Sequence, residues 1–519
     1  MRLPRWPQGR AGQALLALGL GALSGSLYWL SIPRIDAYWW AWLCLLPCFL
    51  VVRLGSRRQL VVAAATAGLV AAIGRVYWIT DTLQLYGGLS FPVSLATNAL
   101  LVAYLALYPV TFCLGCSGLR FASPLFGWAA ASFWVLLEWV QTWMISGFPW
   151  ELLGYSQYLN RPLVQVASVT GVYGLSFLIV LVNATLSQLL VLRTRWLALA
   201  GPPFLLLVVA LGFGYHRLGA LCYEEGPTLK VGIVQGNFSQ DLKWKTDRFR
   251  QTTERYVRLT RELAAGARMD LVVFPETALP FFFRAPRFAD HYRQVVDLAR
   301  QIHTPILVGS LDVERSAGQR QVYNRAFLVD ADGDIVGTAD KVHLVPFGEY
   351  LPLPFLFQYL EGLTRESGAF AHGEAHATLS LPAADVDFGV FICFESIFPG
   401  ITRTLARKGA AFLITTTNDA WFGRSSAPHQ HFSMAVLRAV ETGRPVLRVA
   451  NTGISGLISP SGEILARTEL FETAVLTVDL HPRAGLTPYA RYGNVLLVLS
   501  AALLAGVAYR QRRVAPSAA

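Results

Sequence analysis

The sequence predicts a protein of two parts, an α-helical membrane region and an α/β domain inserted near the C-terminal end of that region. Hydrophobic residues make up 54% of the 519 residues and charged residues only 15%, whereas about a quarter of the residues are charged in a typical soluble domain. Long apolar runs fill most of the first 216 residues, and short β-rich runs alternate with polar, helix-like stretches from residue 229 onwards. A large part of the chain is therefore expected to lie in lipid.

Eight apolar runs come close to the length of about 20 residues that a helix needs to cross a bilayer. They lie at residues 11–32, 38–52, 59–80, 92–117, 121–143, 162–192, 196–216 and 493–509. The chain is accordingly expected to divide into three domains. These are a seven-helix membrane domain at 1–216, an α/β domain at 217–492, and an eighth membrane helix with a basic tail at 493–519.

The basic residues behind the net charge of +11 lie mainly at the ends of the apolar runs, which indicates membrane orientation and argues against a nucleic-acid partner. One set of run ends carries twelve arginines, and the other set carries only Arg34 and Arg161. The twelve are Arg2, Arg5, Arg10, Arg53, Arg57, Arg58, Arg120, Arg193, Arg195, Arg510, Arg512 and Arg513. Because basic residues are retained on the cytoplasmic side, both termini are expected in the cytoplasm and the α/β domain on the opposite face.

Two ionisable residues lie inside the expected spans, Arg75 near the outer end of the third and Glu138 near the outer end of the fifth. A charge inside the bilayer is costly unless it is paired or functional. Because the two residues share a depth, one interpretation is an Arg75–Glu138 pair that holds two helices together. The alternative is that Arg75 binds a phosphate or a lipid headgroup, which makes both residues candidates for substrate binding.

The α/β pattern supplies the frame for the chemistry. Strands are predicted at 229–235, 271–274, 305–309, 326–329, 389–392, 412–415 and 446–449, and helices near 246–267, 287–302, 397–408 and 428–442. Reactive side chains follow this pattern at Glu276 after the strand 271–274, at Lys341 after the turn signal Asp332-Gly333, and at Cys393 after the strand 389–392.

These three residues are the candidate site. Each alone has an ordinary explanation, because a strand-end cysteine is usually inert, a lysine after a turn is usually solvated, and a glutamate can cap a helix. Together, a carboxylate, a cation and a thiol supply the proton acceptor, the oxyanion stabiliser and the nucleophile that acyl transfer requires. The helix-like run after Cys393 is expected to lower the pKa of its thiol through the positive end of the helix dipole.

The motifs Phe-Pro-Glu ending at Glu276, Lys-Val-His-Leu-Val-Pro-Phe-Gly-Glu starting at Lys341, and Cys-Phe-Glu starting at Cys393 resemble those of the nitrilase, or carbon–nitrogen hydrolase, superfamily. With the seven preceding spans and the one that follows, essentially the whole chain is similar to the apolipoprotein N-acyltransferase family. The resemblance implies an α-β-β-α sandwich inserted between the seventh and eighth helices of an eight-span membrane domain.

The resemblance also implies roles for the motif residues. Glu276 would be the general base, Lys341 the oxyanion stabiliser, and Cys393 the nucleophile that carries the acyl group as a thioester. Glu349 would support Lys341 and the base, and Glu395 would be a further essential acidic residue.

Two aromatic positions complete the implied site. Trp244 matches a tryptophan that the family uses near the acyl substrate. Phe394 stands where many relatives have tyrosine, so a phenol hydroxyl has no role here, while the backbone N–H of Phe394 can still complete an oxyanion hole.

The implied reaction transfers an acyl chain from the sn-1 position of a phospholipid, with phosphatidylethanolamine expected, to the α-amino group of the S-diacylglyceryl-cysteine of an apolipoprotein. It would be the last step of lipoprotein maturation in the bacterial inner membrane, with the α/β domain in the periplasm. No metal or cofactor is expected, since the thioester stores the acyl group and His429 and His431 lack a third ligand at suitable spacing. A monomer is expected.

Two apolar stretches beside the candidate site, at 278–284 and 351–360, are unusual for a soluble domain. One interpretation is that they belong to the domain's own core. The favoured interpretation is that they dip into the outer leaflet, with Phe282 and Leu356 contacting substrate lipid. Trp150, in the outer loop Gly147-Phe148-Pro149-Trp150, is expected on the same lipid-facing surface.

Two other functions remain open from the residues alone. A membrane-tethered amidase of the nitrilase type would use the same three residues to hydrolyse a small amide, but it would not need eight spans. A non-catalytic lipid-handling protein with an inactive nitrilase domain would not need an intact Glu276, Lys341 and Cys393.

Overall fold

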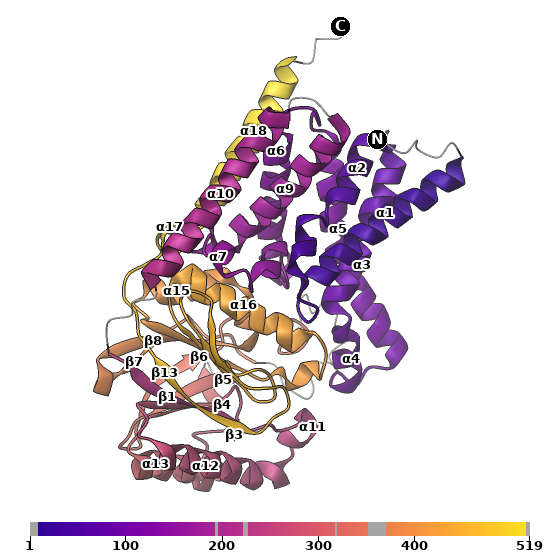
Figure 1. The fold of residues 1–519 in the computed structure, drawn as a ribbon. Helices are drawn as coiled ribbons and strands as arrows, with labels where there is room; N and C mark the ends of the chain where they lie inside the picture. The colour runs from indigo at the N-terminus through magenta and orange to yellow at the C-terminus, as the bar shows by residue number, and fades with distance from the viewer. Residues whose placement is uncertain (1–8, 193–195, 222–226, 317–318, 351–369, 515–519) are drawn as a thin grey trace. The chain divides into compact units, whose positions relative to one another are not determined.

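A computed structural model describes residues 9–192, 196–221, 227–316, 319–350 and 370–514, and Figure 1 shows its course. The chain divides into two compact units. The helical unit holds residues 1–81, 90–219 and 492–519, and the α/β unit holds residues 82–89 and 220–491. The short stretch 82–89 thus lies with the α/β unit, although the sequence assigned it to the membrane region.

The helical unit is built from apolar helices joined by short helical turns. The helices that lie at least partly in it are, in chain order, α1 Arg10–Ser31, η1 Tyr38–Trp42, α2 Leu46–Leu54, α3 Arg57–Val76, α4 Trp78–Leu85, α5 Phe91–Ser117, α6 Phe126–Gln141, η2 Met144–Ser146, η3 Leu153–Gln157, α7 Arg161–Val164, α8 Ala167–Thr170, α9 Val172–Leu192, α10 Trp196–Leu221 and α18 Val495–Val514. Five of them, α1, α3, α5, α9 and α10, are long and apolar enough to cross a membrane, and shorter apolar helices lie at Tyr38–Leu54 and Val495–Gln511. The expected sixth run is divided, because only α9 continues as a long helix after the single turns α7 and α8.

Small residues bring α1 and α3 close together. A side chain added at Gly21 would meet the Ala63 carbonyl oxygen at 2.3 Å, and one added at Gly25 would meet that of Ala67 at 2.5 Å. Glycines four residues apart let two helix backbones approach, which is how helices associate where lipid offers no hydrophobic driving force. The α1–α3 contact therefore depends on the absence of side chains at these positions.

The expected Arg75–Glu138 pair is not formed. Arg75 Nη1 donates to the backbone oxygen of Glu151 at 3.4 Å, and its guanidinium lies over the Tyr28 ring. Glu138 Oε1 instead accepts from the Trp134 indole at 2.8 Å and from the Leu153 amide at 2.9 Å. Both ionisable groups are buried and hydrogen-bonded to other partners of the same unit. These hydrogen bonds offset part of the unfavourable free energy of placing the two groups in apolar surroundings.

Trp150 does not lie on a lipid-facing surface, so that expectation is wrong. Its side chain is 1% exposed. The indole stacks on Phe148 with ring centroids 5.9 Å apart and lies against Trp78 at 5.0 Å. This aromatic packing removes Trp150 from the surface of the unit.

The α/β unit contains two β-sheets, each with parallel strands at its centre (Figure 1). The first sheet has the order β13-β1-β2-β4-β5-β6, with β3 paired to β4, and the second has the order β12-β11-β10-β9-β8-β7. The first contains β1 Leu229–Gln235, β2 Leu271–Val273, β3 Leu279–Phe282, β4 Ile306–Ser316, β5 Gln319–Val329, β6 Ile335–Asp340 and β13 Ala474–Leu480. The second contains β7 Thr378–Leu381, β8 Val386–Ile392, β9 Phe412–Thr417, β10 Val446–Ala450, β11 Gly456–Ile458 and β12 Ile464–Arg467.

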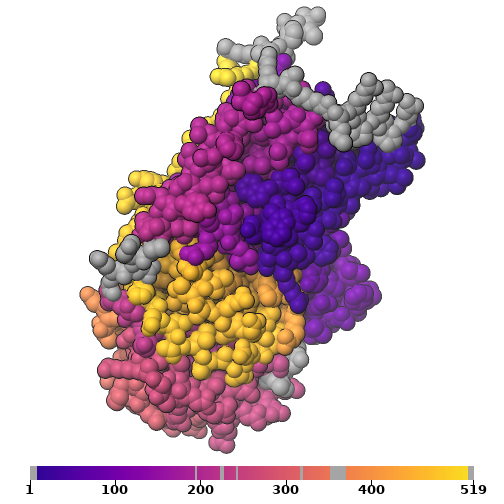
Figure 2. All heavy atoms as spheres, viewed as in Figure 1, coloured from indigo at the N-terminus to yellow at the C-terminus, as the bar shows by residue number. Residues whose placement is uncertain are grey.

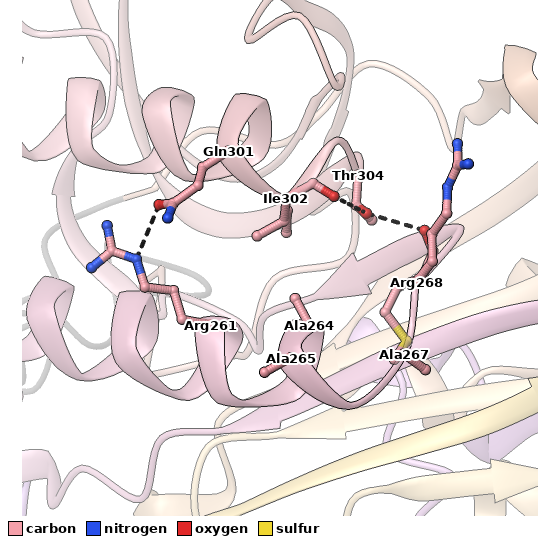
Figure 3. Close-up of a pocket in the computed structure, with 9 residues that line it drawn as sticks. Arg261, Ala264, Ala265, Ala267, Arg268, Gln301, Ile302 and Thr304 are labelled. Carbon is pink, nitrogen blue, oxygen red and sulfur yellow. Dashed lines mark hydrogen bonds between the residues drawn. The ribbon is translucent and has the colours of Figure 1, made fainter.

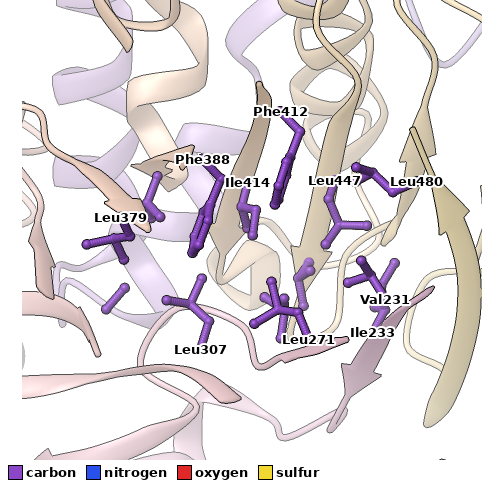
Figure 4. Close-up of a cluster of buried hydrophobic side chains, with 14 of the residues drawn as sticks. Val231, Ile233, Leu271, Leu307, Leu379, Phe388, Phe412, Ile414, Leu447 and Leu480 are labelled. Carbon is purple, nitrogen blue, oxygen red and sulfur yellow. The ribbon is translucent and has the colours of Figure 1, made fainter. Parts of the chain in front are cut away.

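Two hydrophobic layers hold this unit together. The inner faces of the two sheets meet in one core, where Leu271 and Leu307 of the first sheet face Phe388, Ile414 and Leu447 of the second (Figure 4). The outer face of the first sheet packs against α12 Phe249–Gly266 and α13 Ala289–Ile302. Helices α15 Pro399–Arg407 and α16 Ala427–Thr442 pack against the second sheet. The expected α-β-β-α layering is therefore present.

The remaining helical elements of the α/β unit are short. They are α11 Gln240–Lys243, η4 Thr246–Arg248, η5 Pro286–Phe288, η7 Pro382–Ala384, η8 Cys393–Ile397, η9 Asp419–Phe422 and α17 Pro488–Tyr492. In the space-filling view, the orange-to-yellow C-terminal part of the chain covers the upper part of the face of this unit that is turned to the viewer, and the pink part of the chain lies below it (Figure 2).

The interpretation of residues 278–284 as a segment that enters the bilayer is wrong. Leu279–Phe282 forms β3, and Ala278, Phe281 and Phe283 are buried in the layer between the first sheet and its helices. The stretch is apolar because it belongs to the domain's own core. The second apolar stretch, 351–360 with Leu356, lies outside the described residues.

We predict that Leu447→Ala, which opens a cavity between the two sheets, lowers the free energy of unfolding of the α/β unit by about 2–5 kcal/mol. Leu465→Ala removes the same atoms from a side chain that is 52% exposed, so its effect should stay within about 0.5 kcal/mol. Denaturant unfolding of the full chain, followed through amide exchange of β9 and β10, measures both. Equal effects would contradict the assignment of the inter-sheet core.

Candidate active site

Glu276, which the sequence placed after a strand, and Lys341, which it placed after a turn signal, meet in a buried cluster with Glu349. Lys341 Nζ lies 3.1 Å from Glu276 Oε1 and 2.7 Å from Glu349 Oε1. Lys341 is 1% exposed and Glu276 is 5% exposed. A buried charge requires partners of opposite sign, and here one ammonium bridges two carboxylates.

Glu276 is held as a carboxylate by donors on several sides. Besides Lys341, its Oε1 accepts from Asn324 Nδ2 at 2.8 Å, and its Oε2 accepts from the Asn418 amide at 2.9 Å. Burial alone would raise the pKa of Glu276, but the Lys341 charge and these hydrogen bonds hold it below the ordinary value. The charged form, which is the form that can accept a proton, therefore prevails at neutral pH.

Lys341 stays protonated for the converse reason. Burial tends to lower the pKa of a lysine, but the charges of Glu276 and Glu349 raise that of Lys341 well above its ordinary value. Glu349 is fixed in turn, because its Oε2 accepts from the Val345 amide at 2.8 Å. Glu349 thus pairs with the ammonium in a fixed position, and its supporting role in catalysis stays a prediction.

A second buried lysine, Lys243, holds the turn that carries Glu276. Its Nζ donates to the Glu276 carbonyl oxygen at 3.2 Å and to Thr277 Oγ1 at 2.7 Å. Thr277 has φ +44°, a conformation that non-glycine residues rarely adopt. Burial lowers the pKa of Lys243 to about 7, although the Glu276 and Cys393 charges act in the opposite direction. The sequence analysis did not single out this residue.

Cys393 lies at the end of β8 in a strained backbone conformation, with φ +53°. Strain of this kind costs roughly 1–3 kcal/mol and clusters at functional sites. Burial raises the pKa of Cys393, the Glu276 charge raises it further, and the Lys341 charge lowers it. The expected lowering by a helix dipole is therefore wrong, because Cys393 is followed by the single turn η8 and is 7% exposed.

Glu395 ties the Cys393 turn to the loop after Lys341. Its Oε1 accepts from the Val342 amide at 2.8 Å and the His343 amide at 2.9 Å, and its Oε2 accepts from the Ile392 amide at 2.6 Å. Burial raises the pKa of Glu395 to about 7. Its hydrogen bonds are with backbone amides, and His376 Nδ1 lies 3.7 Å from its Oε1, so the contacts of this acidic residue join the two reactive segments.

The predicted aromatic residues lie beside this cluster. Trp244 and Phe282 are half-buried, and both pack against a small apolar cluster formed by Leu311, Leu344 and Phe370. The Phe394 ring is buried and lies 5.4 Å from the Phe398 ring and 5.9 Å from the His343 ring. Trp244 and Phe282, distant in sequence, are thus brought together near the loop that follows Lys341.

His431 belongs to a buried polar network beneath Cys393. Its Nε2 lies 3.0 Å from the Cys393 carbonyl oxygen and its Nδ1 3.0 Å from Asp419 Oδ1. Arg448 Nη2 donates to Asp419 Oδ2 at 2.6 Å and lies 3.1 Å from His431 Nδ1. The Arg448 and His431 charges hold the pKa of Asp419 below its usual range, against the effect of burial.

Several of these residues could have been found by the reasoning that found Cys393. Asn418 and Asp419 follow a predicted strand, 412–415, and Lys243 directly precedes Trp244. Asn324 carried no such signal, because only residues 326–329 of its strand were predicted. It comes to Glu276 through the pairing of β4 with β5 and β6, which the sequence did not fix.

A pocket of about 390 Å³ lies elsewhere, between the C-terminal ends of α12 and α13 (Figure 3). Arg261 Nε donates to Gln301 Oε1 across it at 3.1 Å, and Thr304 lines its end. None of the candidate residues lines this pocket.

The two-sheet α/β unit with its helical outer layers has the fold of a carbon–nitrogen hydrolase, and the carbon–nitrogen hydrolase family model matches residues 230–489. The model of the apolipoprotein N-acyltransferase N-terminal domain matches residues 24–185. The chain therefore belongs to the apolipoprotein N-acyltransferase family.

Named relatives agree with both matches. An apolipoprotein N-acyltransferase of Geobacter metallireducens is 39% identical over 95% of this chain and 96% of its own length. One of Methylococcus capsulatus is 37% identical over 87% of this chain and 88% of its own. A solved structure, a nitrilase-superfamily member of Saccharomyces cerevisiae, is 21% identical, covers 49% of this chain and 90% of its own, and has a TM-score of 0.38.

We predict that Glu395→Gln loosens the segment that joins Lys341 to Cys393. An amide offers one acceptor oxygen in place of two, which leaves a buried backbone N–H without a partner at a cost of about 1–3 kcal/mol. Hydrogen exchange at Val342, His343 and Ile392 should accelerate roughly 10- to 100-fold. Glu262→Gln, on the exposed side of α12, is the control; unchanged exchange in Glu395→Gln would show that the carboxylate does not hold these amides.

Proposed function

We propose that the chain transfers an acyl group from a membrane phospholipid to the N-terminal amine of an apolipoprotein, with Glu276, Lys341 and Cys393 as the catalytic residues. One observation carries the proposal. The Lys341 ammonium lies between the Glu276 and Glu349 carboxylates, and the charges of Glu276 and Lys341 both shift the pKa of the Cys393 thiol. This arrangement offers a charged base, a fixed cation and a neutral nucleophile. Family membership supports the choice of substrates.

In the first half-reaction, Cys393 Sγ attacks the carbonyl carbon of the sn-1 ester of the phospholipid. Because burial and the nearby carboxylate keep the thiol protonated, its proton must leave as the S–C bond forms, and Glu276 accepts it. The ester C–O bond then breaks, and Glu276 returns the proton to the departing alkoxide. A lysophospholipid leaves, and the acyl group remains on Cys393 as a thioester.

In the second half-reaction, the α-amine of the S-diacylglyceryl-cysteine attacks the thioester carbon. The new N–C bond forms, the S–C bond breaks, and the amine loses one proton to Glu276. That proton restores the Cys393 thiol, so the enzyme ends as it began. Both half-reactions develop negative charge on the same carbonyl oxygen, which the Lys341 ammonium and the Phe394 N–H would stabilise.

The apolar cluster beside Lys341 suits a substrate with acyl chains. Trp244 and Phe282 border it, and Leu344 on the loop between Lys341 and Glu349 belongs to it. We assign this side of the site to the acyl chain, with Trp244 and Phe282 as contacts. No cofactor is assigned, because the thioester itself stores the acyl group.

We further propose the eight-span topology in the bacterial inner membrane, with both termini cytoplasmic and the α/β unit periplasmic. It rests on the arginine asymmetry of the run ends and on the apolar helices that the structure contains. Substrate lipids and apolipoproteins would then meet the site at the outer leaflet, and the protein would act as a monomer.

Mass spectrometry of the purified full chain, mixed with phosphatidylethanolamine and then with a diacylated lipopeptide, tests the proposed function. We expect an acyl adduct on Cys393 that disappears as the lipopeptide gains one acyl chain. Cys393→Ala should abolish both events, whereas Cys116→Ala, in a buried helix position of α5, should retain them. Transfer to water alone would favour an amidase-type hydrolase, and absence of an adduct would favour a non-catalytic lipid-handling protein.

Lys341→Met should slow adduct formation by at least about 100-fold, the scale expected when an oxyanion donor is lost. Methionine fills similar space without charge, so the effect reports the loss of the ammonium, both as an oxyanion donor and as the charge that holds the pKa of Glu276 down, rather than a cavity. The measurement is the rate of adduct formation at saturating lipid. An unchanged rate would remove Lys341 from the proposed mechanism.

The proposed topology predicts opposite labelling of two added cysteines. Glu262→Cys, exposed on α12, should react with a membrane-impermeant maleimide in cells whose outer membrane alone is permeabilised. Ser117→Cys, at the end of α5, should react only after lysis. The reverse pattern would invert the orientation.

A further inference from the structure

The Cys393 turn is fixed by hydrogen bonds on both of its sides. On the N-terminal side, Glu395 holds the Ile392 amide. On the C-terminal side, the Cys393 carbonyl oxygen lies 3.0 Å from His431 Nε2. A carbonyl oxygen can only accept, so Nε2 must carry the proton and donate it.

The carbonyl of Cys393 and the N–H of Phe394 belong to one peptide group. A trans peptide is planar, and its C=O and N–H point in opposite directions. When His431 fixes the carbonyl oxygen on the side of α16, it also fixes the Phe394 N–H on the opposite side. The positive φ of Cys393 fits this support, because strained backbone conformations persist where the surrounding structure holds them.

The orientation of His431 is itself set by a fully buried network. His431 and Arg448 are 0% exposed, and Asp419 is 1% exposed. Arg448 Nη2 lies 3.1 Å from His431 Nδ1, to which it can donate, and it donates to Asp419 Oδ2 at 2.6 Å, while Arg448 Nε donates to the Ile454 carbonyl oxygen at 3.1 Å. This anchors the imidazole from the side away from Cys393.

Further contacts hold η9, the turn that begins at Asp419. Thr82 Oγ1 donates to the Trp421 carbonyl oxygen at 2.9 Å, and the Tyr86 hydroxyl donates to that of Ala420 at 3.2 Å. The Tyr86 and Trp421 rings lie 5.1 Å apart. The stretch 82–89, which belongs to the α/β unit, thereby fixes the backbone from which Asp419 reaches His431.

We propose that His431 is a positioning residue that aims the Phe394 N–H at the oxyanion by holding the Cys393 carbonyl. This proposal rests on the proposed function, since it presupposes acyl transfer at Cys393. The hydrogen-bonding contacts described for His431 are with the Cys393 carbonyl oxygen, Asp419 and Arg448. Its loss should therefore slow acyl transfer without changing the ability of the thiol to react with reagents that form no oxyanion.

Two replacements of similar size separate this role from a general structural one. The amide nitrogen of glutamine can reach the place of Nε2, and that of asparagine the place of Nδ1. His431→Gln should keep the donor to Cys393 and stay within about fivefold of the unaltered rate of adduct formation. His431→Asn should keep the Asp419 contact but lose the donor to the Cys393 carbonyl oxygen. It should therefore slow adduct formation by roughly 100-fold, the scale of one lost oxyanion donor.

The test compares two rates on the full-length chain of each variant, namely Cys393 acylation at saturating phosphatidylethanolamine and Cys393 alkylation by iodoacetamide. We expect alkylation to change less than threefold in both variants, and His429→Gln, half-exposed on the same helix, to leave both rates unchanged. Equal loss of both rates in His431→Asn, or equal acylation by His431→Asn and His431→Gln, would overturn the proposal. If the unaltered chain forms no adduct, the proposed function fails instead.

Discussion

The structure of the site depends on one interaction, the bracketing of the Lys341 ammonium by the Glu276 and Glu349 carboxylates. Desolvating three charges is expensive, and a buried set of this kind persists only when its members pair closely and their remaining atoms find hydrogen bonds. The rest of the site supplies those bonds, from the Asn324 side chain and from the backbone amides of Val345 and Asn418. The consequence is a carboxylate that stays charged beside a thiol that stays neutral. The thiol therefore transfers its proton to the carboxylate only while the sulfur forms its bond to the carbonyl carbon of the substrate.

The sequence predicted the central strands and covering helices of the α/β unit because their apolar runs are short, β-branched and bounded by turn residues. The strands 229–235 and 271–274 and the helix 287–302 reappear within about two residues as β1, β2 and α13. Edge strands such as β7 and β12 were missed, because their half-buried faces give weak patterns. Composition misled at 278–284, where an apolar stretch beside a polar site was assigned to lipid although it forms β3 within the core. The pattern of apolar residues alone does not tell whether a segment packs in the protein core or in lipid.

The residues of the candidate site were predictable where they follow a predicted strand, and the structure brings Glu276 and Lys341 together from elements 65 residues apart. What the sequence could not supply were partners set by tertiary packing. Arg75 and Glu138 share a depth in the sequence, yet each bonds to other groups. His431, set aside in the sequence as an incomplete metal ligand, serves a network with Asp419 and Arg448 that no spacing rule anticipates. The direction of the Cys393 pKa shift was also wrong, because burial depends on the completed fold.

The central claim is that the resting site pairs a charged Glu276 with a neutral Cys393 thiol. The most direct measurement is an infrared difference spectrum between the unaltered chain and Cys393→Ser, recorded across neutral and mildly alkaline pH without lipid, where the S–H and carboxyl bands report the two groups separately. The account predicts an S–H band from Cys393 throughout this range. It also predicts that the band of a protonated carboxyl does not differ between the unaltered chain and Cys393→Ser. An absent S–H band at neutral pH, accompanied by a protonated carboxyl that is lost in Glu276→Gln, would show that the proton already rests on Glu276 and would contradict the account.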